Sequence, residues 1–247
     1  MFHKYILDFD PNLFTELLVA TQFEDICKGR QGAILIDNNN GLVPIVRTTT
    51  NYLQASQKFS PIHYKIIDLI KGLAKDLKLE FNNAMVELYD SSYRTMKYHT
   101  DLSLDLADDS YICIFSSYSN NDLTDYRKLK IKDKVTNIES EVILENNSCV
   151  IFSKSDNSKH LHKIVLDKIN NKDKKWLGIT FRLSKTFINF VDDKPYFYPT
   201  DIPLRVGSDD EKREFMKCKG SENLGIDYVY PTIHYTVSIS DTLPIIK

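Results

Sequence analysis

The sequence predicts an α+β protein in which two helices precede a β-sandwich or barrel. Two amphipathic helical patterns lie before residue 80, and eight short runs of β-type residues, separated by polar turns, follow between residues 84 and 184. Helices followed by a run of strands are typical of the α+β class. The chain has 247 residues, of which 42% are hydrophobic and 27% charged, so one large domain can bury a full core.

The first helix has a recognisable start. Asp10 can cap a helix and Pro11 suits the first helical position, and Leu13, Leu17 and Leu18 then form an apolar face. These residues predict a helix at the beginning of the chain.

A short strand over 32–36 separates this helix from a second one. Ser60 and Pro61 open the second helix. Its apolar residues recur at helical spacing: Ile66, Ile67, Ile70, Leu73 and Leu77.

Short strands dominate the rest of the chain. We expect them over 84–89, 95–99, 110–116, 126–132, 141–145, 148–153, 161–166 and 176–184. Ser208 to Glu211 have the spacing of a capping box, which predicts a short helix over 209–217. A further strand is expected over 233–239.

The composition narrows the class of protein. The four cysteines, at positions 27, 113, 149 and 218, are dispersed, which disfavours a zinc site or a disulfide scaffold and suits a reducing compartment. No apolar run approaches the length of a membrane span. We therefore expect a soluble intracellular protein, cytoplasmic or nuclear, with no membrane partner. The net charge of −2 provides no basic field that would attract nucleic acid.

One group of residues has the pattern of a metal centre. His99 and Asp101 end a predicted strand, and His160 and His162 lie on another about sixty residues later. One histidine, a carboxylate two residues away and a distant histidine form a facial triad, which holds non-haem Fe(II) and leaves positions open for a co-substrate and O₂. Arg182, on the last predicted strand, could pair with a co-substrate carboxylate. The alternative is that His99 and His162 are ordinary polar residues at strand ends.

Around these residues the sequence resembles the AlkB-type branch of the Fe(II)/2-oxoglutarate dioxygenases, over about residues 10–190. Phe81 to Tyr89 resembles the strand that leads to the metal motif of the family, and Asn147 to Phe152 the strand before its distal histidine. His162-Lys163-Ile164 stands where the family has His-x-hydrophobic, so we prefer His162 to His160 as the third ligand. Ile179 to Arg182 matches the final strand.

The resemblance implies a fold, cofactors and residue roles. His99, Asp101 and His162 would bind Fe(II), Tyr89 would contact 2-oxoglutarate and Arg182 would bind one of its carboxylates. The implied fold is a double-stranded β-helix, or jelly roll, with the N-terminal helices packed on one sheet. The dioxygenase domain would cover residues 1–190, with 2-oxoglutarate and O₂ as its co-substrates.

The sequence departs from the family pattern at the co-substrate site. The family has Asn where this chain has Glu87, and a second Arg where this chain has Trp176. Lys175 is a candidate for binding the distal carboxylate instead, although strand alternation puts Trp176, not Lys175, on the side of Arg182.

The resemblance implies a nucleic-acid base as substrate, hydroxylated and, where the carbon is an N-methyl, demethylated. Candidate phosphate contacts are Lys128, Lys130, Lys132, Lys134, Arg47 and Arg94, and candidate base-stacking residues are Tyr52, Tyr93 and Tyr98. The lysines could equally be a solvated strand and the tyrosines ordinary packing residues. A protein or peptide hydroxylase, or a jelly-roll binding module without turnover, therefore stays open.

The C-terminal segment, residues 191–247, lies outside the resemblance. It is rich in tyrosine and contains several prolines. It could recognise substrate or form a dimer, and we favour an extension that packs over one end of the barrel.

Overall fold

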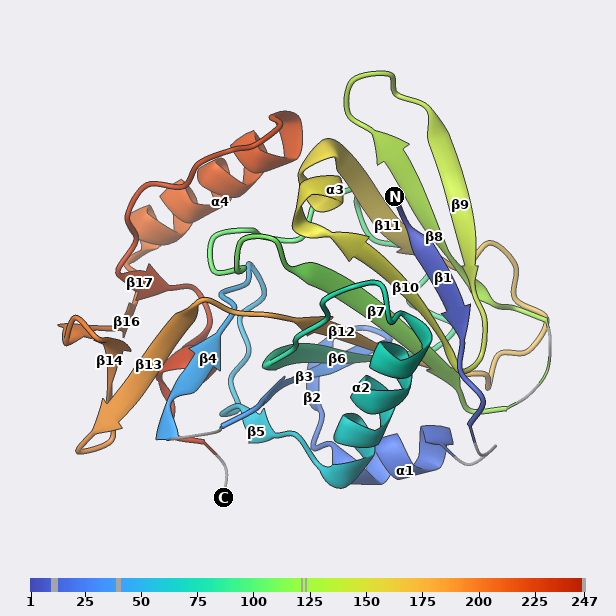
Figure 1. Ribbon diagram of the computed structural model, residues 1–247, viewed down its shortest axis with the longest axis horizontal. Coiled ribbons are helices and arrows are strands. Elements are labelled where there is room, and N and C mark those ends of the chain that lie inside the picture. The colour runs from blue at the N-terminus through green and yellow to red at the C-terminus, as the bar shows by residue number, and fades with distance from the viewer. Residues whose placement is uncertain (10–12, 39–40, 121, 123, 246–247) are drawn as a thin grey trace.

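An eight-stranded sheet forms the centre of the protein in the computed structural model, which describes residues 1–9, 13–38, 41–120, 122 and 124–245 (Figure 1). Its strands follow the order β1 (His3–Ile6), β10 (Ser148–Ser153), β7 (Tyr111–Tyr118), β12 (Trp176–Arg182), β6 (Asn83–Tyr89), β3 (Arg30–Ile36) and β2 (Glu24–Cys27), with β5 (Gln57–Lys58) pairing with β3. All of these pairings are antiparallel except that of β5 with β3. The last predicted strand, β12, therefore lies between β6 and β7.

A three-stranded sheet faces the central one. Its strands follow the order β11 (His160–Val165), β8 (Arg127–Asp133) and β9 (Glu139–Leu144). Leu129 and Ile131 of β8 are buried, while Lys128, Lys130 and Lys132, which alternate with them, are partly exposed. This is the alternation of a strand with one face on a core. Leu129 and Ile164 share a hydrophobic cluster with Ile114 and Val150 of the central sheet. One part of the core therefore lies between the two sheets.

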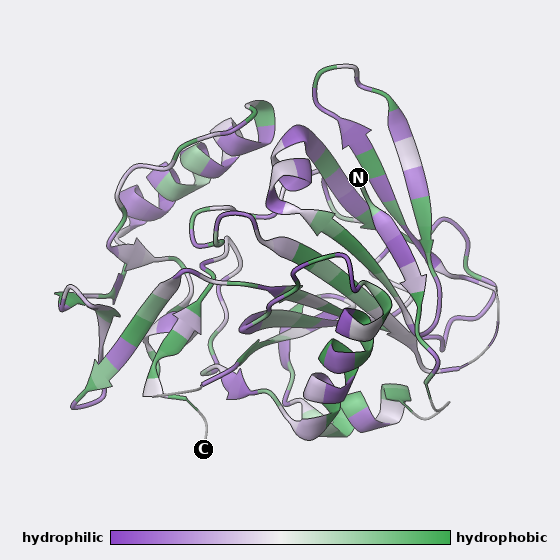
Figure 2. Ribbon diagram, viewed as in Figure 1, coloured by the Kyte–Doolittle hydropathy of each residue, from purple (hydrophilic) through white to green (hydrophobic). Residues whose placement is uncertain are grey.

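Two helices cover the other face of the central sheet. They are α1 (Leu13–Ala20) and α2 (Pro61–Leu73), which lie together in Figure 1. Leu17 and Ile70 are fully buried in one cluster with Val86 and Phe115 of the sheet. The outer surface of α2 is hydrophilic (Figure 2). The prediction that the N-terminal helices pack on one sheet is confirmed; the predicted cap, Asp10, lies outside the described residues.

The chain after β12 builds a third sheet together with β4 (Val43–Ile45). β13 (Thr186–Val191) pairs with β14 (Lys194–Tyr198) and with β4, and β15 (Ile202–Pro203) completes four strands. The predicted boundary between residues 190 and 191 falls inside β13. The β13–β14 hairpin therefore joins both predicted parts of the chain, and the division at this residue stays a prediction.

The helix α4 (Asp209–Leu224) begins where the sequence predicts it. The hydroxyl of Ser208 accepts from the backbone N–H of Glu211 at 3.3 Å, and the Glu211 carboxylate accepts from the N–H of Ser208 at 2.8 Å, which is a capping box. The predicted end at residue 217 is wrong. Cys218 and Glu222 continue the buried side of the helix, and the charge of Glu222 conceals this continuation in the sequence.

Small elements complete the chain. They are α3 (Lys154–Lys159), β16 (Arg205–Val206), β17 (Tyr235–Thr236) and the 3₁₀ helix η2 (Ile239–Thr242). The strand predicted over 233–239 is thus reduced to β17, because the chain turns into η2. None of the helices in the described part of the chain is long and apolar enough to cross a membrane.

Seven of the eight predicted strands lie within two residues of an observed strand at each end. The exception is 95–99, where only Thr95 and His99 form isolated bridges, to Val165 and His162. The backbone between these two residues has no continuous ladder of partners, so no strand forms. The prediction of a β-rich protein with few helices is confirmed, with mostly antiparallel sheets.

Gly178 provides a test of the packing between the two facing sheets. It lies opposite Glu87 on β6, and a methyl group on its Cα would overlap the indole of Trp176, which is buried against Tyr89. We expect Gly178→Ala to lower the free energy of unfolding by about 1–3 kcal/mol through overpacking, measured by urea denaturation. Gly220→Ala is the control: nothing lies within 4 Å of its added methyl, so it should leave stability unchanged or higher. Equal effects of the two substitutions would contradict this packing.

Candidate metal centre

Three side chains that the sequence singles out come together beside the large sheet. One ligand atom each from His99, Asp101 and His162 lies within 4.8 Å of the other two. The Asp101 Oδ1 is 3.8 Å from the Nε2 of His99 and 3.4 Å from the Nε2 of His162. The structure thus brings together the two histidines and the carboxylate of the predicted triad.

Backbone pairing places the two histidines. His99 and His162 each donate the backbone N–H to the carbonyl of the other, at 3.0 and 2.7 Å, and their ring centroids are 4.7 Å apart. Asp101, two residues beyond His99, then reaches the same side.

The protonation of these groups suits metal binding. The Nδ1 of His99 lies 3.0 Å from the carbonyl of Lys97, which can only accept, so Nδ1 carries the proton and Nε2 has its lone pair free. Burial and the neighbouring His162 lower the pKa of His99 to about 4. Burial alone would raise the pKa of Asp101, but Arg182 and the two histidines hold it below its ordinary value. Two imidazoles and one carboxylate are the donor set of non-haem Fe(II) sites, so these residues fit the ion that the resemblance implies.

Asp101 is fixed by two neighbours. The side-chain amide of Asn157 in α3 donates to the Asp101 carbonyl at 2.8 Å and accepts from the Asp101 N–H at 2.8 Å. The Nε of Arg182 lies 3.2 Å from the Asp101 Oδ2. Both partners are buried, so the carboxylate is held by groups that water does not replace.

The helix α4 holds the same segment from outside. Asn223 accepts from the backbone N–H and the hydroxyl of Thr100, and Lys219 donates to the carbonyl and the hydroxyl of Thr100. Glu222 accepts from the N–H and hydroxyl of Ser103. The residues on either side of Asp101 are therefore bonded to the C-terminal part of the chain.

A cavity of about 250 Å³ lies beside the triad. It is lined by Arg30, Arg47, Thr48, Thr49, Thr50, Met85, Glu87, Tyr93, Met96, Lys97, His99, Thr100, Asp101, Leu102, Arg182 and Lys219. Its wall contains five cationic side chains and two carboxylates, which suits an anionic ligand.

The other predicted site residues do not line this cavity. Tyr89 is fully buried behind it, and its hydroxyl donates to Glu87 at 2.7 Å. Lys175 is exposed and lines a different hollow, next to Asp25 and Gly29. The structure therefore does not bring Lys175 to the triad, because it points to the opposite side of β12 from Arg182, as alternation requires.

His160 also lies away from the triad. Its Nδ1 is 2.8 Å from the carbonyl of Asp156, and its Nε2 is 3.7 Å from the Asp133 carboxylate. Of the two histidines on β11, the one in the cluster is His162.

The predicted nucleic-acid contacts are mostly engaged elsewhere. Arg47 is buried and donates to Asp105 and to two backbone carbonyls. Lys128 is paired with Glu141 and Asp167, Lys130 lies 3.9 Å from Asp167, and Lys134 donates to carbonyls at the end of α4. Arg94 donates to the carbonyls of residues 166 and 167.

The three predicted stacking residues lie in different places. Tyr93 lines the cavity. Tyr52 is fully buried beneath it. The ammonium group of Lys163 lies over the ring of Tyr98, with its Nζ 4.3 Å from the ring centroid. Only Tyr93 is therefore placed to stack on a molecule in the cavity.

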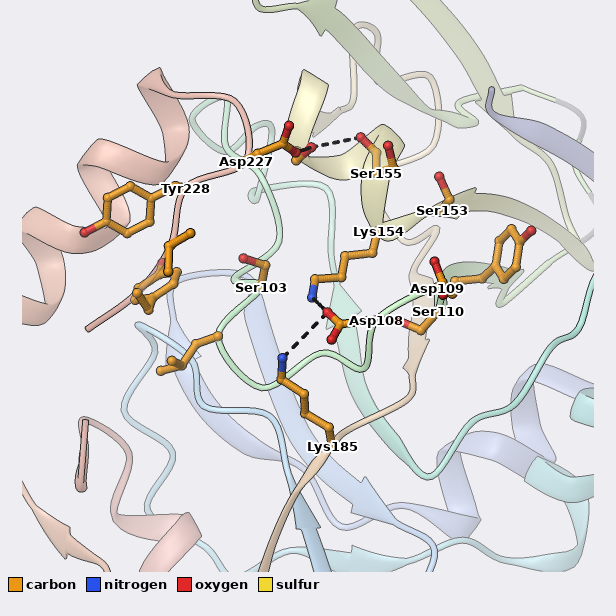
Figure 3. A pocket seen from close by; sticks show the side chains of 15 residues that line it. Ser103, Asp108, Asp109, Ser110, Ser153, Lys154, Ser155, Lys185, Asp227 and Tyr228 are labelled. Carbon is orange, nitrogen blue, oxygen red and sulfur yellow. Dashed lines mark hydrogen bonds and ion pairs between the residues drawn. The ribbon is translucent and has the colours of Figure 1, made fainter. Parts of the chain in front are cut away.

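A larger hollow, of about 640 Å³, lies away from the triad (Figure 3). Lys154 and Lys185 both point at Asp108 on its floor, and Tyr228 and Asp227 form one side. It contains none of the three triad residues, so its size does not make it the reactive site.

Sequence reasoning missed several residues of the site. Arg30 enters the cavity from β3, and Asn157 and Asn223 bind the backbone of the metal segment. Arg30 and Gly32 do share one face of a strand, which is a local signal. The strand order that brings this face to the triad is not visible in the sequence.

No family model and no curated protein matches the chain. Among solved structures, that of OsALKBH1 is similar with a TM-score of 0.49 and 15% identity, over 73% of this chain and 97% of that chain. The functional interpretation therefore depends on the geometry of the cavity.

Asn157 provides a test of how the metal segment is held. We expect Asn157→Ala to weaken the binding of a divalent metal by roughly 10- to 100-fold, because the backbone of Asp101 loses both of its hydrogen bonds to the side-chain amide of Asn157. Isothermal titration with Mn²⁺ measures this affinity.

Asn82→Ala is a matched control. Asn82 makes the same pair of bonds, at 2.7 and 3.0 Å, to the backbone of Ser184, away from the triad. Both substitutions should lower stability by about 1–3 kcal/mol. Equal metal affinities for the two variants would show that Asn157 is only a structural residue.

Proposed function

We propose that the protein is an Fe(II)- and 2-oxoglutarate-dependent oxygenase with a jelly-roll core. The observation that supports this most is the cluster of His99, Asp101 and His162, of which His99 and Asp101 line a cationic cavity. Iron with 2-oxoglutarate and O₂ would convert a substrate C–H to C–OH, as 2-oxoglutarate becomes succinate and CO₂. The two facing sheets, with helices outside, are consistent with a jelly roll.

The residues of the chain would divide this work. His99, Asp101 and His162 hold the metal from one side and leave its cavity side open for ligands. Arg182 holds Asp101 ionised and faces the cavity, where a guanidinium can bind a carboxylate. Met85, Met96 and Leu102 contribute the apolar part of the cavity wall, which limits water around the reacting carbon.

We propose a nucleic-acid base as the first candidate substrate, with N-methyl groups released as formaldehyde. Tyr93 on the cavity wall supports it, because a flipped base needs an aromatic ring to stack on. Lys97, exposed at the rim, could contact a phosphate.

A protein or peptide is the second candidate substrate. The pairing of Lys128 with carboxylates and the burial of Arg47 favour it, because few cations stay free for a phosphate backbone. The third alternative, a binding module without turnover, is motivated by Glu87 and Trp176.

Removal of the triad tests the chemistry. His99→Ala, Asp101→Ala and His162→Ala should each lower succinate formation more than about 100-fold, since metal ligands matter at least as much as their supporting residues. Succinate is measured by mass spectrometry after incubation with Fe(II), ascorbate and 2-oxoglutarate. His160→Ala is the control and should keep most of the activity. Unchanged turnover in any of the three triad variants would mean that the site is elsewhere.

The substrate classes are separated by product analysis. The purified protein is incubated with N-methylated oligonucleotides and, in parallel, with a peptide library. Formaldehyde from the oligonucleotides supports the first candidate, and a gain of one oxygen in peptides supports the second. No succinate with any substrate, together with no metal affinity, would contradict the enzyme proposal itself.

A further inference from the structure

Three residues form a row across the inner face of the central sheet. Arg30 on β3 stands opposite Tyr89 on β6, and Tyr89 stands opposite Trp176 on β12. Residues in register on antiparallel strands share a face, so all three side chains lie on the side of the inner core. The indole of Trp176 stacks on Tyr89, with ring centroids 4.8 Å apart. The cation of this row therefore comes from β3, and not from the last strand.

Two of the cationic side chains of the cavity have nearly all of their donors in use: Arg47 four of its five and Lys219 all three. Arg47 gives Nε and Nη2 to Asp105, and Nη1 to two backbone carbonyls. The ammonium group of Lys219 gives its three bonds to the carbonyl and hydroxyl of Thr100 and to Glu222. Lys219 therefore cannot bind a further anion without breaking a bond, and Arg47 has only one N–H of Nη2 left for one.

The other three cationic residues of the cavity wall, Arg30, Lys97 and Arg182, differ in their exposure and in their partners. Arg182 is paired with Asp101 beside the metal ligands, and Lys97 is exposed. Arg30 is largely buried and contacts Glu87 through Nη2 at 2.5 Å, while its Nε is buried without a hydrogen bond. The Nε of Arg182 is also buried without a hydrogen bond, but it lies 3.2 Å from the metal ligand Asp101. Arg30 is therefore the cation that combines a free donor with a place in the cavity away from the metal ligands.

A second unpartnered donor lies beside Arg30. The hydroxyl of Tyr52 is buried and makes no hydrogen bond. Its ring lies over Gly32, where an added Cβ would be 3.0 Å from the hydroxyl, and Gly32 is paired with Glu87. The guanidinium of Arg30 and the hydroxyl of Tyr52 are thus two donors next to each other in need of an acceptor.

We propose that Arg30 and Tyr52 bind the carboxylate of 2-oxoglutarate that lies away from the metal, an inference that rests on the proposed function. Arg182 serves the end of the molecule beside Asp101. Arg30 and Arg182 are offset by Glu87 and Asp101, so Fe(II) and the two carboxylates of 2-oxoglutarate would offset each other with no net buried charge. The chain thereby replaces the missing arginine of β12 with one from β3.

The single tryptophan makes binding visible without turnover. Trp176 is 2% exposed and contacts Tyr89, whose hydroxyl is bonded to Glu87. The protein is loaded with Zn²⁺, which has no redox chemistry, and the fluorescence of Trp176 is followed as a ligand is added. The ligands are 2-oxoglutarate and 2-oxopentanoate, which has a methyl in place of the distal carboxylate. The wild type should bind 2-oxoglutarate roughly 10- to 100-fold more tightly, as a charged hydrogen-bonded pair implies.

Variants identify the partner of the distal carboxylate. Arg30→Met should reduce this preference to about onefold, and Tyr52→Phe should reduce it roughly 3- to 10-fold. Tyr52→Phe removes a hydroxyl that has no partner in the fold, so it should fold normally. Lys175→Met, outside the cavity, should keep the wild-type preference. Zn²⁺ affinity should be unchanged in all three variants.

The contrary outcomes are distinct. A full preference in both Arg30→Met and Tyr52→Phe overturns the assignment and leaves the proposed function intact, and so does loss of the preference in Lys175→Met. Failure of the Zn²⁺-loaded wild type to bind 2-oxoglutarate overturns both proposals. If Arg30→Met loses Zn²⁺ affinity, Tyr52→Phe decides the question alone.

Discussion

The pair of backbone hydrogen bonds between His99 and His162 is the contact on which the candidate site depends. The segment 95–101 forms no regular strand. It is attached to β11 by two bridges, from Thr95 to Val165 and from His99 to His162. Without the bridge at His99, the segment would be bonded to β11 only near Thr95, four residues before the first imidazole. β11 is in turn paired along its length with β8, so the bridge transmits the rigidity of a sheet to a loop. This arrangement allows a metal segment to be irregular and still hold a fixed geometry.

Charge pairing is the second constraint. The cavity wall and its surroundings bury four ion pairs: Arg182 with Asp101, Arg47 with Asp105, Arg30 with Glu87, and Lys219 with Glu222. A buried charge without a partner destabilises a protein by about 3–5 kcal/mol, so each pair must form as a unit. The charged groups lie 2.5 Å apart in the Arg30 pair and 3.2 Å apart in the Arg182 pair. The Arg47 pair also binds the C-terminal segment, because the Nη1 of Arg47 donates to the carbonyls of Ile233 and Tyr235.

The triad could be predicted from the sequence because its signal is local. His99 and Asp101 are two residues apart, and His162 is preferred to His160 because Lys163-Ile164 follows it, as in the family that the sequence resembles. In the fold, the side chain of His160 turns to Asp133 and Asp156. Arg30 could not be assigned in the same way. Its role depends on β3 lying next to β6, a pairing between segments more than fifty residues apart that no local pattern encodes.

The predicted strand at 95–99 and the predicted end of the helix at 217 were wrong for a related reason. The strand was predicted from a short run of β-type residues, and the helix from a capping box, which marks the start of a helix and not its end. The segment before His99 is held by isolated backbone bonds, and the end of α4 is held by polar ones, from Lys219, Glu222 and Asn223. Neither signal registers such contacts.

The polar end of α4 couples the C-terminal segment to the metal segment. Glu222 is 4% exposed and accepts from Lys219, Ser103 and the hydroxyl of Tyr230, and burial lowers the pKa of Lys219. A network of this kind is favourable only when every member is present, since each unpaired member would keep its desolvation penalty. The backbone at Thr100 supplies part of that network. The geometry of Asp101 and the docking of α4 therefore form together, which makes the C-terminal segment part of the site rather than a cover placed over it.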